Sequence, residues 1–243
     1  MRIIARKLLR HLEYDFHSLA VPKLGLRDLK FDLPVLIENL NPTVIDVGAN
    51  KGQTIRLMKE CLPSCKIFSF EPNVSLHPTL KSLFDDGSVV VEGKVLGKKS
   101  GTVFFNIYEN NELSSVLSLA DSEGNPFKDT VLEKRQECQM TTLDVYCEDN
   151  GIAKVDLLKI DTQGFDFDVL QGAEELLGRK AVAVILVEVN FSDLYDGQCG
   201  FGEIERFLHA LGYGMLGLYE IVRDNGCIRW ATACFRKLNT SNA

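Results

Sequence analysis

The sequence has no apolar run long enough to cross a membrane, no Cys-x-x-Cys pair and no excess of basic residues. A membrane-spanning helix needs about 20 predominantly apolar residues, and no stretch approaches that length. The net charge of −7 has the wrong sign for general binding to nucleic acid, which needs a basic face. The seven cysteines are scattered and odd in number, which favours a reduced, cytoplasmic setting. These absences predict no transmembrane segment, no nucleic-acid partner and no metal site.

The dinucleotide fingerprint Gly-x-Gly-x-x-Gly is also missing. In its place, a short, mostly apolar run at residues 43–47 contains Asp46. Gly48, Asn50 and Gly52 follow, so that the spacing is Asp-x-Gly-x-x-x-Gly, and a helical pattern comes next. A strand, a glycine turn and a helix in that order form a ligand site at the carboxyl end of the strand. A carboxylate there would repel a pyrophosphate but suits a cationic or amine-bearing ligand. The alternative is an ordinary tight turn in another α/β domain.

A second acidic residue follows a second buried strand at residues 66–70. Glu71 stands 25 positions beyond Asp46, where doubly wound folds place a carboxylate on a ribose diol. One carboxylate can accept both hydroxyl hydrogens, and Asn73 lies two positions further on. We therefore expect Glu71 and Asn73 to bind a nucleoside. The alternative is a solvated acid at a strand end.

An apolar wall for the base of that nucleoside is predicted further along the chain. A third strand is expected at residues 88–92, and Val95 and Leu96 follow it where an adenine ring would need apolar contacts. Residues 101–107 are typical of an antiparallel strand, and residues 137–141 of another.

The chemistry is predicted to lie after a strand at residues 155–160. This strand brings Lys159 and Asp161 to its carboxyl end, and in a doubly wound sheet it lies next to the first strand, across the point where ligands bind. The next strand, at residues 181–187, ends on Glu188 and adds a further carboxylate at the same edge. Asp161, Lys159 and Glu188 are therefore the candidate catalytic residues.

The acceptor-facing parts of the chain are the least patterned. Residues 110–134 are polar with weak periodicity, and we interpret them as a mobile, substrate-facing excursion together with residues 191–201. Residues 166–177 favour a helix after Gly164. Two strands joined by Asp-Asn-Gly, at residues 213–222 and 227–236, form a hairpin that we expect at the edge of the sheet.

The chain begins with a basic, amphipathic segment at residues 3–19, which predicts a helix. We expect this helix to lie across the domain or to form a homodimer contact, and a helix at a membrane surface is the alternative. A second short helix is predicted at residues 32–40. The expected organisation is an N-terminal helical cap at 1–42 and one larger domain at 43–243.

Taken together, these motifs resemble the FkbM-type methyltransferases, a family of the class I methyltransferase superfamily. The similarity rests on residues 45–52, 70–73, 158–166, 169–173 and 187–189. It implies an α/β fold with a Rossmann-like, mostly parallel sheet, an antiparallel strand at its edge and helices on both faces. It also implies S-adenosylmethionine as cofactor, bound by Asp46, Gly48, Asn50, Gly52, Glu71, Asn73, Val95, Leu96 and Asp161. The reaction would be O-methylation of a sugar or natural-product hydroxyl, so the expected partner is a small-molecule or glycan acceptor.

The sequence departs from the family pattern at two positions. Gln163 and Asp166 stand where the family usually carries Glu, so a base role at position 163 is in doubt. Asp161 is our first choice of general base by location, with Glu188 and His77 as weaker candidates. Lys159 would orient the acceptor or form an ion pair.

Two other functions stay open from the sequence. One is a nicotinamide-dependent oxidoreductase on a Rossmann-like sheet, against which the missing fingerprint counts. The other is a catalytically silent module that keeps the methyltransferase fold and binds a partner. The two enzymatic hypotheses differ in the cofactor that the protein should bind.

Overall fold

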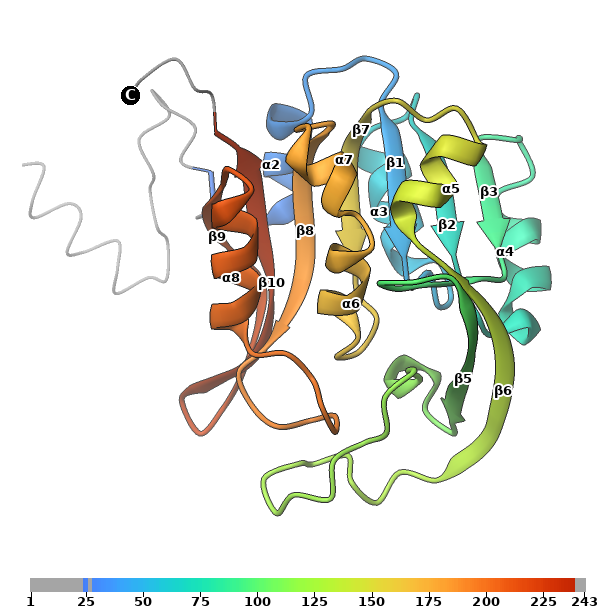
Figure 1. Cartoon of the computed structure of the whole chain (residues 1–243), viewed down its shortest axis with the longest axis vertical. Helices are drawn as coiled ribbons and strands as arrows, with labels where there is room; N and C mark the ends of the chain where they lie inside the picture. Colours follow the sequence, from blue (N-terminus) through green and yellow to red (C-terminus); the bar gives the residue numbers. More distant parts are fainter. Residues whose placement is uncertain (1–23, 26–27, 239–243) are drawn as a thin grey trace, which may run out of the picture.

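A computed structural model describes residues 24–25 and 28–238 of the chain. The helix predicted at residues 3–19 lies outside these residues. The described part is built on a seven-stranded sheet (Figure 1). In spatial order its strands are β3 (Val89–Glu92), β2 (Lys66–Phe70), β1 (Thr43–Val47), β7 (Val155–Ile160), β8 (Val182–Asn190), β10 (Cys227–Lys237) and β9 (Tyr213–Asp224).

The first five strands in that order pair in parallel, whereas β10 is antiparallel to both β8 and β9. The β9–β10 hairpin forms one edge of the sheet, so the predicted fold class is confirmed. The neighbouring β1 and β7 lie at the centre, where the strand order reverses direction. In open α/β sheets this switch point is where ligands bind, outside the carboxyl ends of the strands.

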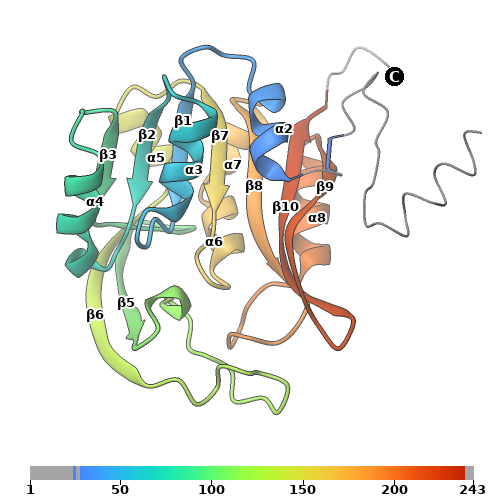
Figure 2. The same ribbon diagram turned by 180° about the vertical axis from the view of Figure 1, so that it is seen from behind.

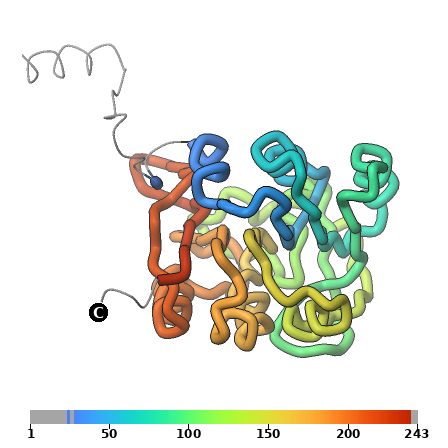
Figure 3. The backbone as a smooth tube through the Cα atoms, turned by 90° about the horizontal axis from the view of Figure 1, so that it is seen from above, coloured from blue at the N-terminus to red at the C-terminus, as the bar shows by residue number. Residues whose placement is uncertain are grey.

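Helices cover both faces of the sheet, as Figures 1 and 2 show from opposite sides. One face carries α2 (Leu29–Leu36), α3 (Gln53–Cys61) and α4 (His77–Leu83), with the 3₁₀ helix η1 (Val74–Leu76) before α4. The other face carries α5 (Leu143–Asp149), α6 (Asp166–Gln171), α7 (Glu174–Gly178) and α8 (Phe201–Ala210). Seen from above, the sheet lies between these two rows (Figure 3).

The two layers of helices explain why the central strands are apolar without alternation. A parallel strand that is covered on both faces needs apolar side chains on both. In β7, Leu157 faces the core under α2 and α3, whereas Leu158 and Ile160 face the core under α5–α8. Among the described residues, no helix is both long and apolar enough to cross a membrane.

A second, three-stranded sheet extends below the carboxyl edge of the main sheet (Figure 1). It consists of β4 (Val95–Leu96), β6 (Leu132–Thr141) and β5 (Gly101–Tyr108), in that order. Between β5 and β6 the chain forms the 3₁₀ helix η2 (Asn111–Leu113) and then a long loop at residues 114–131. We call residues 109–131 the β5–β6 excursion.

Several sequence predictions of element bounds differ from the structure, and for three of them the structure shows the physical reason. The strand predicted at 137–141 begins at Leu132, because β6 pairs with β5 along almost its whole length. The helix predicted at 166–177 is divided into α6 and α7. A Cβ at Gly172 would lie 2.1 Å from the main-chain oxygen of Gly97, so the chain passes here at a separation that only glycine allows. The helix predicted at 32–40 is α2, which begins earlier because Asp28 caps it by accepting the main-chain N–H of Lys30.

Candidate active site

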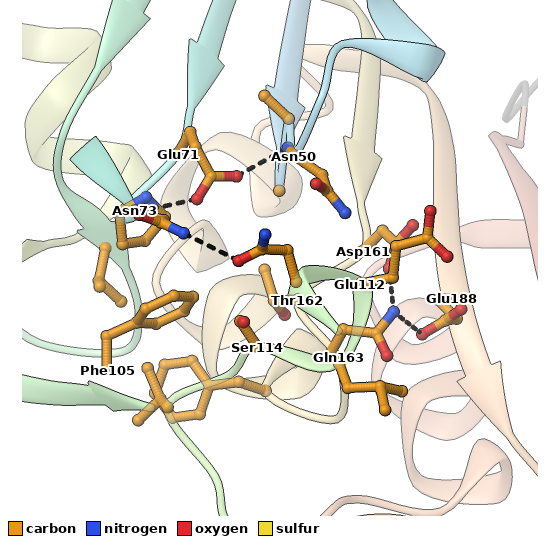
Figure 4. Close-up of a pocket in the computed structure, with 18 of the residues that line it drawn as sticks. Asn50, Glu71, Asn73, Phe105, Glu112, Ser114, Asp161, Thr162, Gln163 and Glu188 are labelled. Carbon is orange, nitrogen blue, oxygen red and sulfur yellow. Dashed lines mark hydrogen bonds between the residues drawn. The ribbon is translucent and has the colours of Figure 1, made fainter. Parts of the chain in front are cut away.

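The carboxyl ends of β1, β2, β7 and β8 open onto a cavity of about 390 Å³, and β4, β5 and the β5–β6 excursion form its lower side (Figure 4). This volume lies within the usual range for a ligand pocket. Eight of the residues predicted for the site line the cavity, namely Gly48, Asn50, Glu71, Asn73, Val95, Leu96, Asp161 and Glu188.

The loop after β1 brings main chain to the cavity. Gly48 has φ +93°, and a Cβ there would lie 1.9 Å from the main-chain oxygen of Asp161. Only glycine allows this approach between the loops that follow β1 and β7. Asn50 is also left-handed, with φ 47°, and its main-chain N–H donates to the Glu71 side chain.

Glu71 is fixed by two main-chain donors. Its Oε2 accepts the N–H of Asn50 at 2.7 Å, and its Oε1 accepts the N–H of Asn73 at 2.8 Å (Figure 4). Burial raises the pKa of Glu71 to about 7, although these two hydrogen bonds act in the opposite direction. Both oxygens keep further lone pairs, so the carboxylate can still accept hydroxyl groups from a ligand in the cavity.

An apolar wall faces Glu71 across the cavity. Val95 and Leu96 of β4 are almost completely buried and line the cavity, and so do Phe105 of β5 and Phe165 before α6. A planar, apolar ring system could pack against this surface, while Glu71 binds the polar part of the same ligand.

The opposite end of the cavity is acidic. Lys159 Nζ lies 2.9 Å from Asp161 Oδ2, and the lysine side chain is only 8% exposed. The amide nitrogen of Gln163 donates to Asp161 Oδ1 at 2.7 Å and to Glu188 Oε2 at 3.1 Å, so it bridges the two carboxylates. Tyr195 fixes that amide, because its hydroxyl donates to Gln163 Oε1 at 2.8 Å.

The pKa values of the two bridged carboxyl groups move in opposite directions. Burial opposes ionisation of Asp161, but the charge and hydrogen bond of Lys159 outweigh it and lower the pKa of Asp161. Burial raises the pKa of Glu188 well above its usual value, and the nearby charges of Asp161 and Asp166 add to this. Two neighbouring acids with divergent pKa values are suited to different roles.

The structure places three predicted site residues outside the cavity lining. Asp46 is completely buried, and its Oδ2 accepts the Ser69 hydroxyl at 2.9 Å. Gly52 faces α4, since a Cβ there would meet Leu80 and Phe84 at 3.1 Å. Lys159 forms the ion pair with Asp161 that the sequence left as an alternative. These three residues therefore lie behind the cavity wall and do not line the cavity.

The sequence did not identify several residues that line the cavity. Phe127 of the β5–β6 excursion and Trp230 of β10 contact each other, with ring centroids 5.9 Å apart, and both line the cavity with Leu194. Phe127 and Leu194 lie in segments with little periodicity. Trp230 lies in a predicted strand, but the pattern does not show which side chain of that strand reaches the cavity. The expected acceptor-facing segments do contribute to the lining, through Asn110, Asn111, Glu112, Leu113, Ser114, Val116, Phe127 and Leu194.

The cavity fits a polar ligand that has an apolar part. Among the described residues, buried side-chain atoms without a hydrogen-bond partner include Asn50 Oδ1, Thr162 Oγ1 and Asn190 Oδ1, and all three residues line this cavity. Unpartnered buried polar atoms are rare, so they mark places where a ligand or water supplies the partner. Hydroxyl and amine groups would satisfy these acceptors, and the free lone pairs of Glu71 could accept a diol. This set of acceptors therefore suits the phosphate-free nucleoside of S-adenosylmethionine.

The fold and site define a class I methyltransferase-type α/β protein. The chain matches the family model described as the methyltransferase FkbM domain over residues 46–215, and it belongs to this family. It is therefore a methyltransferase by family, with β1, β2 and β7 carrying the motifs.

Individual relatives are distant. The 2-O-methyltransferase NoeI of Sinorhizobium fredii is 23% identical over 171 residues, which cover 67% of this chain and 69% of NoeI. Methyltransferase sdnD of Sordaria araneosa is 28% identical over 161 residues, covering 56% of this chain and 61% of that protein. The crystal structure of methyltransferase FkbM from Methylobacillus flagellatus superimposes with a TM-score of 0.58 at 14% identity. That match covers 88% of this chain and 48% of the other, and it supports the fold.

Proposed function

We propose that the protein is an S-adenosylmethionine-dependent O-methyltransferase that acts on a hydroxyl group of a sugar or natural product. The observation that carries this proposal is the Glu71 carboxylate, which two main-chain N–H groups hold at the cavity beside a loop built without a phosphate-binding fingerprint. Similarity to the 2-O-methyltransferase NoeI supports transfer to oxygen.

Different residues would bind different parts of the cofactor. Glu71 would accept the ribose hydroxyls, and Val95 and Leu96 would flank the adenine. The main chain at Gly48 and the amide of Asn50 would lie along the remainder, close to Asp161. When bound, S-adenosylmethionine supplies a methyl group on a positively charged sulfur, and the acidic end of the cavity favours that charge.

We propose Glu188 as the general base, in preference to Asp161. A base is effective when its pKa lies near the working pH, and the pKa of Glu188 is raised whereas that of Asp161 is lowered. Glu188 would take the proton of the acceptor hydroxyl. Asp161, kept ionised by Lys159, would stabilise positive charge beside it, and Gln163 would hold both carboxylates in place.

Cofactor affinity should depend on pH through Glu71. Because the pKa of Glu71 in the free protein is raised to about 7, the carboxyl is largely protonated below that pH and must lose its proton to accept two ribose hydroxyls. We expect the affinity for S-adenosylhomocysteine to rise by up to about tenfold per pH unit as the pH increases towards 7. Above pH 7 the affinity should level off. Calorimetry across this range measures the effect.

Glu71→Gln should weaken S-adenosylhomocysteine binding by about tenfold to a hundredfold above pH 7 and remove this pH dependence, because an amide cannot accept two hydroxyls through both terminal atoms. Glu60→Gln, the same change at an exposed position of α3, is the control and should bind normally. Unchanged affinity in Glu71→Gln would contradict the assignment of Glu71.

Transfer itself is tested by incubating the protein with radiolabelled S-adenosylmethionine and a broad panel of sugars and hydroxylated natural products. The expected result is that the labelled methyl group is recovered as a methyl ether on an acceptor oxygen. Cofactor binding without transfer to any member of a broad panel would favour a silent binding module.

A further inference from the structure

Trp230 stands where a bent strand turns a large aromatic ring towards the cavity. On β10 it pairs with Asn190 of β8, and the pairing of β10 with β9 is irregular on both sides of it. Irregularities of this kind redirect side chains and are frequent next to active sites. Trp230 lines the cavity from a hairpin that carries none of the family motifs.

The β5–β6 excursion brings a second aromatic ring to the same place. Asn125 is buried, and its amide nitrogen donates to the main-chain oxygens of Ala120 at 2.8 Å and Leu194 at 3.0 Å. Its Oδ1 accepts the N–H of Phe127 at 3.0 Å. These bonds fix the loop that carries Phe127, and its ring contacts Trp230. The two rings therefore form one aromatic surface. Strand pairing positions Trp230, and the hydrogen bonds of Asn125 position Phe127.

Asn190 adds an unsatisfied polar group to this surface. Asn190 is only 6% exposed and lines the cavity. Its Oδ1 has no hydrogen-bond partner among the described residues. A buried carbonyl oxygen of this kind is satisfied by a donor from a ligand or from water. A hydroxyl group is such a donor.

Charge further restricts what can bind. Of the described residues that line the cavity, the acidic ones are Glu71, Glu112, Asp161 and Glu188, and the only lysine or arginine is Lys94. Lys94 precedes β4, beside the apolar wall assigned to adenine, while Asp161 and Glu188 lie at the acceptor end. A phosphate or carboxylate placed on the acceptor would therefore meet carboxylates and no lysine or arginine among the residues that line this end of the cavity.

We infer that Trp230, Phe127 and Asn190 form the acceptor subsite, and that it takes an uncharged, hydroxylated ring whose apolar face lies on the two aromatic rings. The inference rests on the proposed transferase function and adds to it a selection against anionic acceptors. It assigns the binding of the acceptor to a hairpin and an excursion outside the family motifs.

The test uses the fact that Trp230 is the only tryptophan of the chain. The full chain is saturated with S-adenosylhomocysteine and titrated with neutral methyl glycosides, and separately with the corresponding sugar phosphates and uronic acids. The fluorescence of the tryptophan, excited selectively, is recorded at each step. We expect neutral probes to change the emission and to bind at least about tenfold more tightly than their anionic counterparts. Anionic probes that bind as tightly or more tightly would overturn the inference.

Variants separate this inference from the proposed function. For a neutral acceptor found in the transfer assay, Trp230→Ala should raise KM at least about tenfold with a smaller change in kcat and unchanged S-adenosylhomocysteine affinity. Trp230→Phe, which keeps an aromatic face, should recover most of the loss. Phe31→Ala, at a 56% exposed position of α2, is the control.

An unchanged KM in Trp230→Ala with intact cofactor binding overturns the subsite alone. Absence of cofactor binding in the unaltered protein overturns the proposed function and the subsite with it.

Discussion

Glu188→Gln should lower kcat by about two to four orders of magnitude, which is the usual contribution of a general base. The substitution removes the basic oxygen but keeps the shape of the side chain, and the amide oxygen can still accept from Gln163. Binding of S-adenosylhomocysteine and thermal stability should therefore change little. Steady-state kinetics and calorimetry on the same preparations separate these effects.

The pH profile gives an independent readout of this role. The pKa of Glu188 is raised by burial and by neighbouring carboxylates, so kcat of the unaltered protein should fall as the pH drops through that raised value. In Glu188→Gln the remaining activity should no longer follow this titration. Glu137→Gln, the same change at an exposed position of β6, should keep the normal profile. A normal kcat in Glu188→Gln would contradict the assignment.

Asp161→Asn should affect both stability and activity, unlike Glu188→Gln, so the two variants distinguish the roles of the two carboxylates. Removing the charge of Asp161 takes away the ion-pair partner of the buried Lys159 ammonium. Breaking a buried pair on one side costs about 3–5 kcal/mol in the free energy of unfolding. We therefore expect loss of stability together with loss of activity in Asp161→Asn, but loss of activity alone in Glu188→Gln. Chemical denaturation compares the two.

Gly48→Ala should abolish cofactor binding and lower the free energy of unfolding by about 3–5 kcal/mol, the range of the most damaging single substitutions. Two effects add at this position. The residue has φ +93°, which an L side chain rarely adopts, and the new methyl group would overlap the main-chain oxygen of Asp161 at 1.9 Å. Main chain cannot yield as a flexible side chain can, so the loops after β1 and β7 would have to separate.

Gly87→Ala is the matched control for that substitution. Gly87 has φ +74°, but a Cβ there would meet nothing within 4 Å, so the variant measures the conformational cost without the steric one. We expect Gly87→Ala to cost about 1–2 kcal/mol and to bind S-adenosylhomocysteine normally. Equal destabilisation in the two variants would show that the close approach at Gly48 has no effect of its own.

The sequence predicted the parts of the site that follow buried strands. Glu71, Asp161 and Glu188 each stand at the end of an apolar run, and parallel strands deliver their carboxyl ends to one edge of a sheet. This rule needs no knowledge of side-chain packing. The edge hairpin was also predicted, because Asp-Asn-Gly is a local turn signal.

The remainder of the site depends on contacts between distant segments, which local patterns do not encode. Phe127 is placed by the bonds of Asn125 to a loop near Leu194, and Trp230 by an irregular strand pairing. The complete burial of Asp46 could not be predicted either, because the motif gives its position in the chain but not whether its side chain reaches the cavity. Gln163 could be recognised as a departure from the family, yet its bridge between two carboxylates follows only from the left-handed turn at that residue.

The most direct test of the account is a calorimetric comparison of two ligands with the unaltered protein. S-adenosylhomocysteine and NADH share an adenosine moiety but differ in the pyrophosphate. A cavity that is lined by Asp161 and Glu188, beside a loop without a phosphate-binding fingerprint, should reject this group. We expect S-adenosylhomocysteine to bind with one site per chain and NADH to give no measurable heat of binding. Binding of NADH with no binding of S-adenosylhomocysteine would contradict the assignment of this cavity to S-adenosylmethionine.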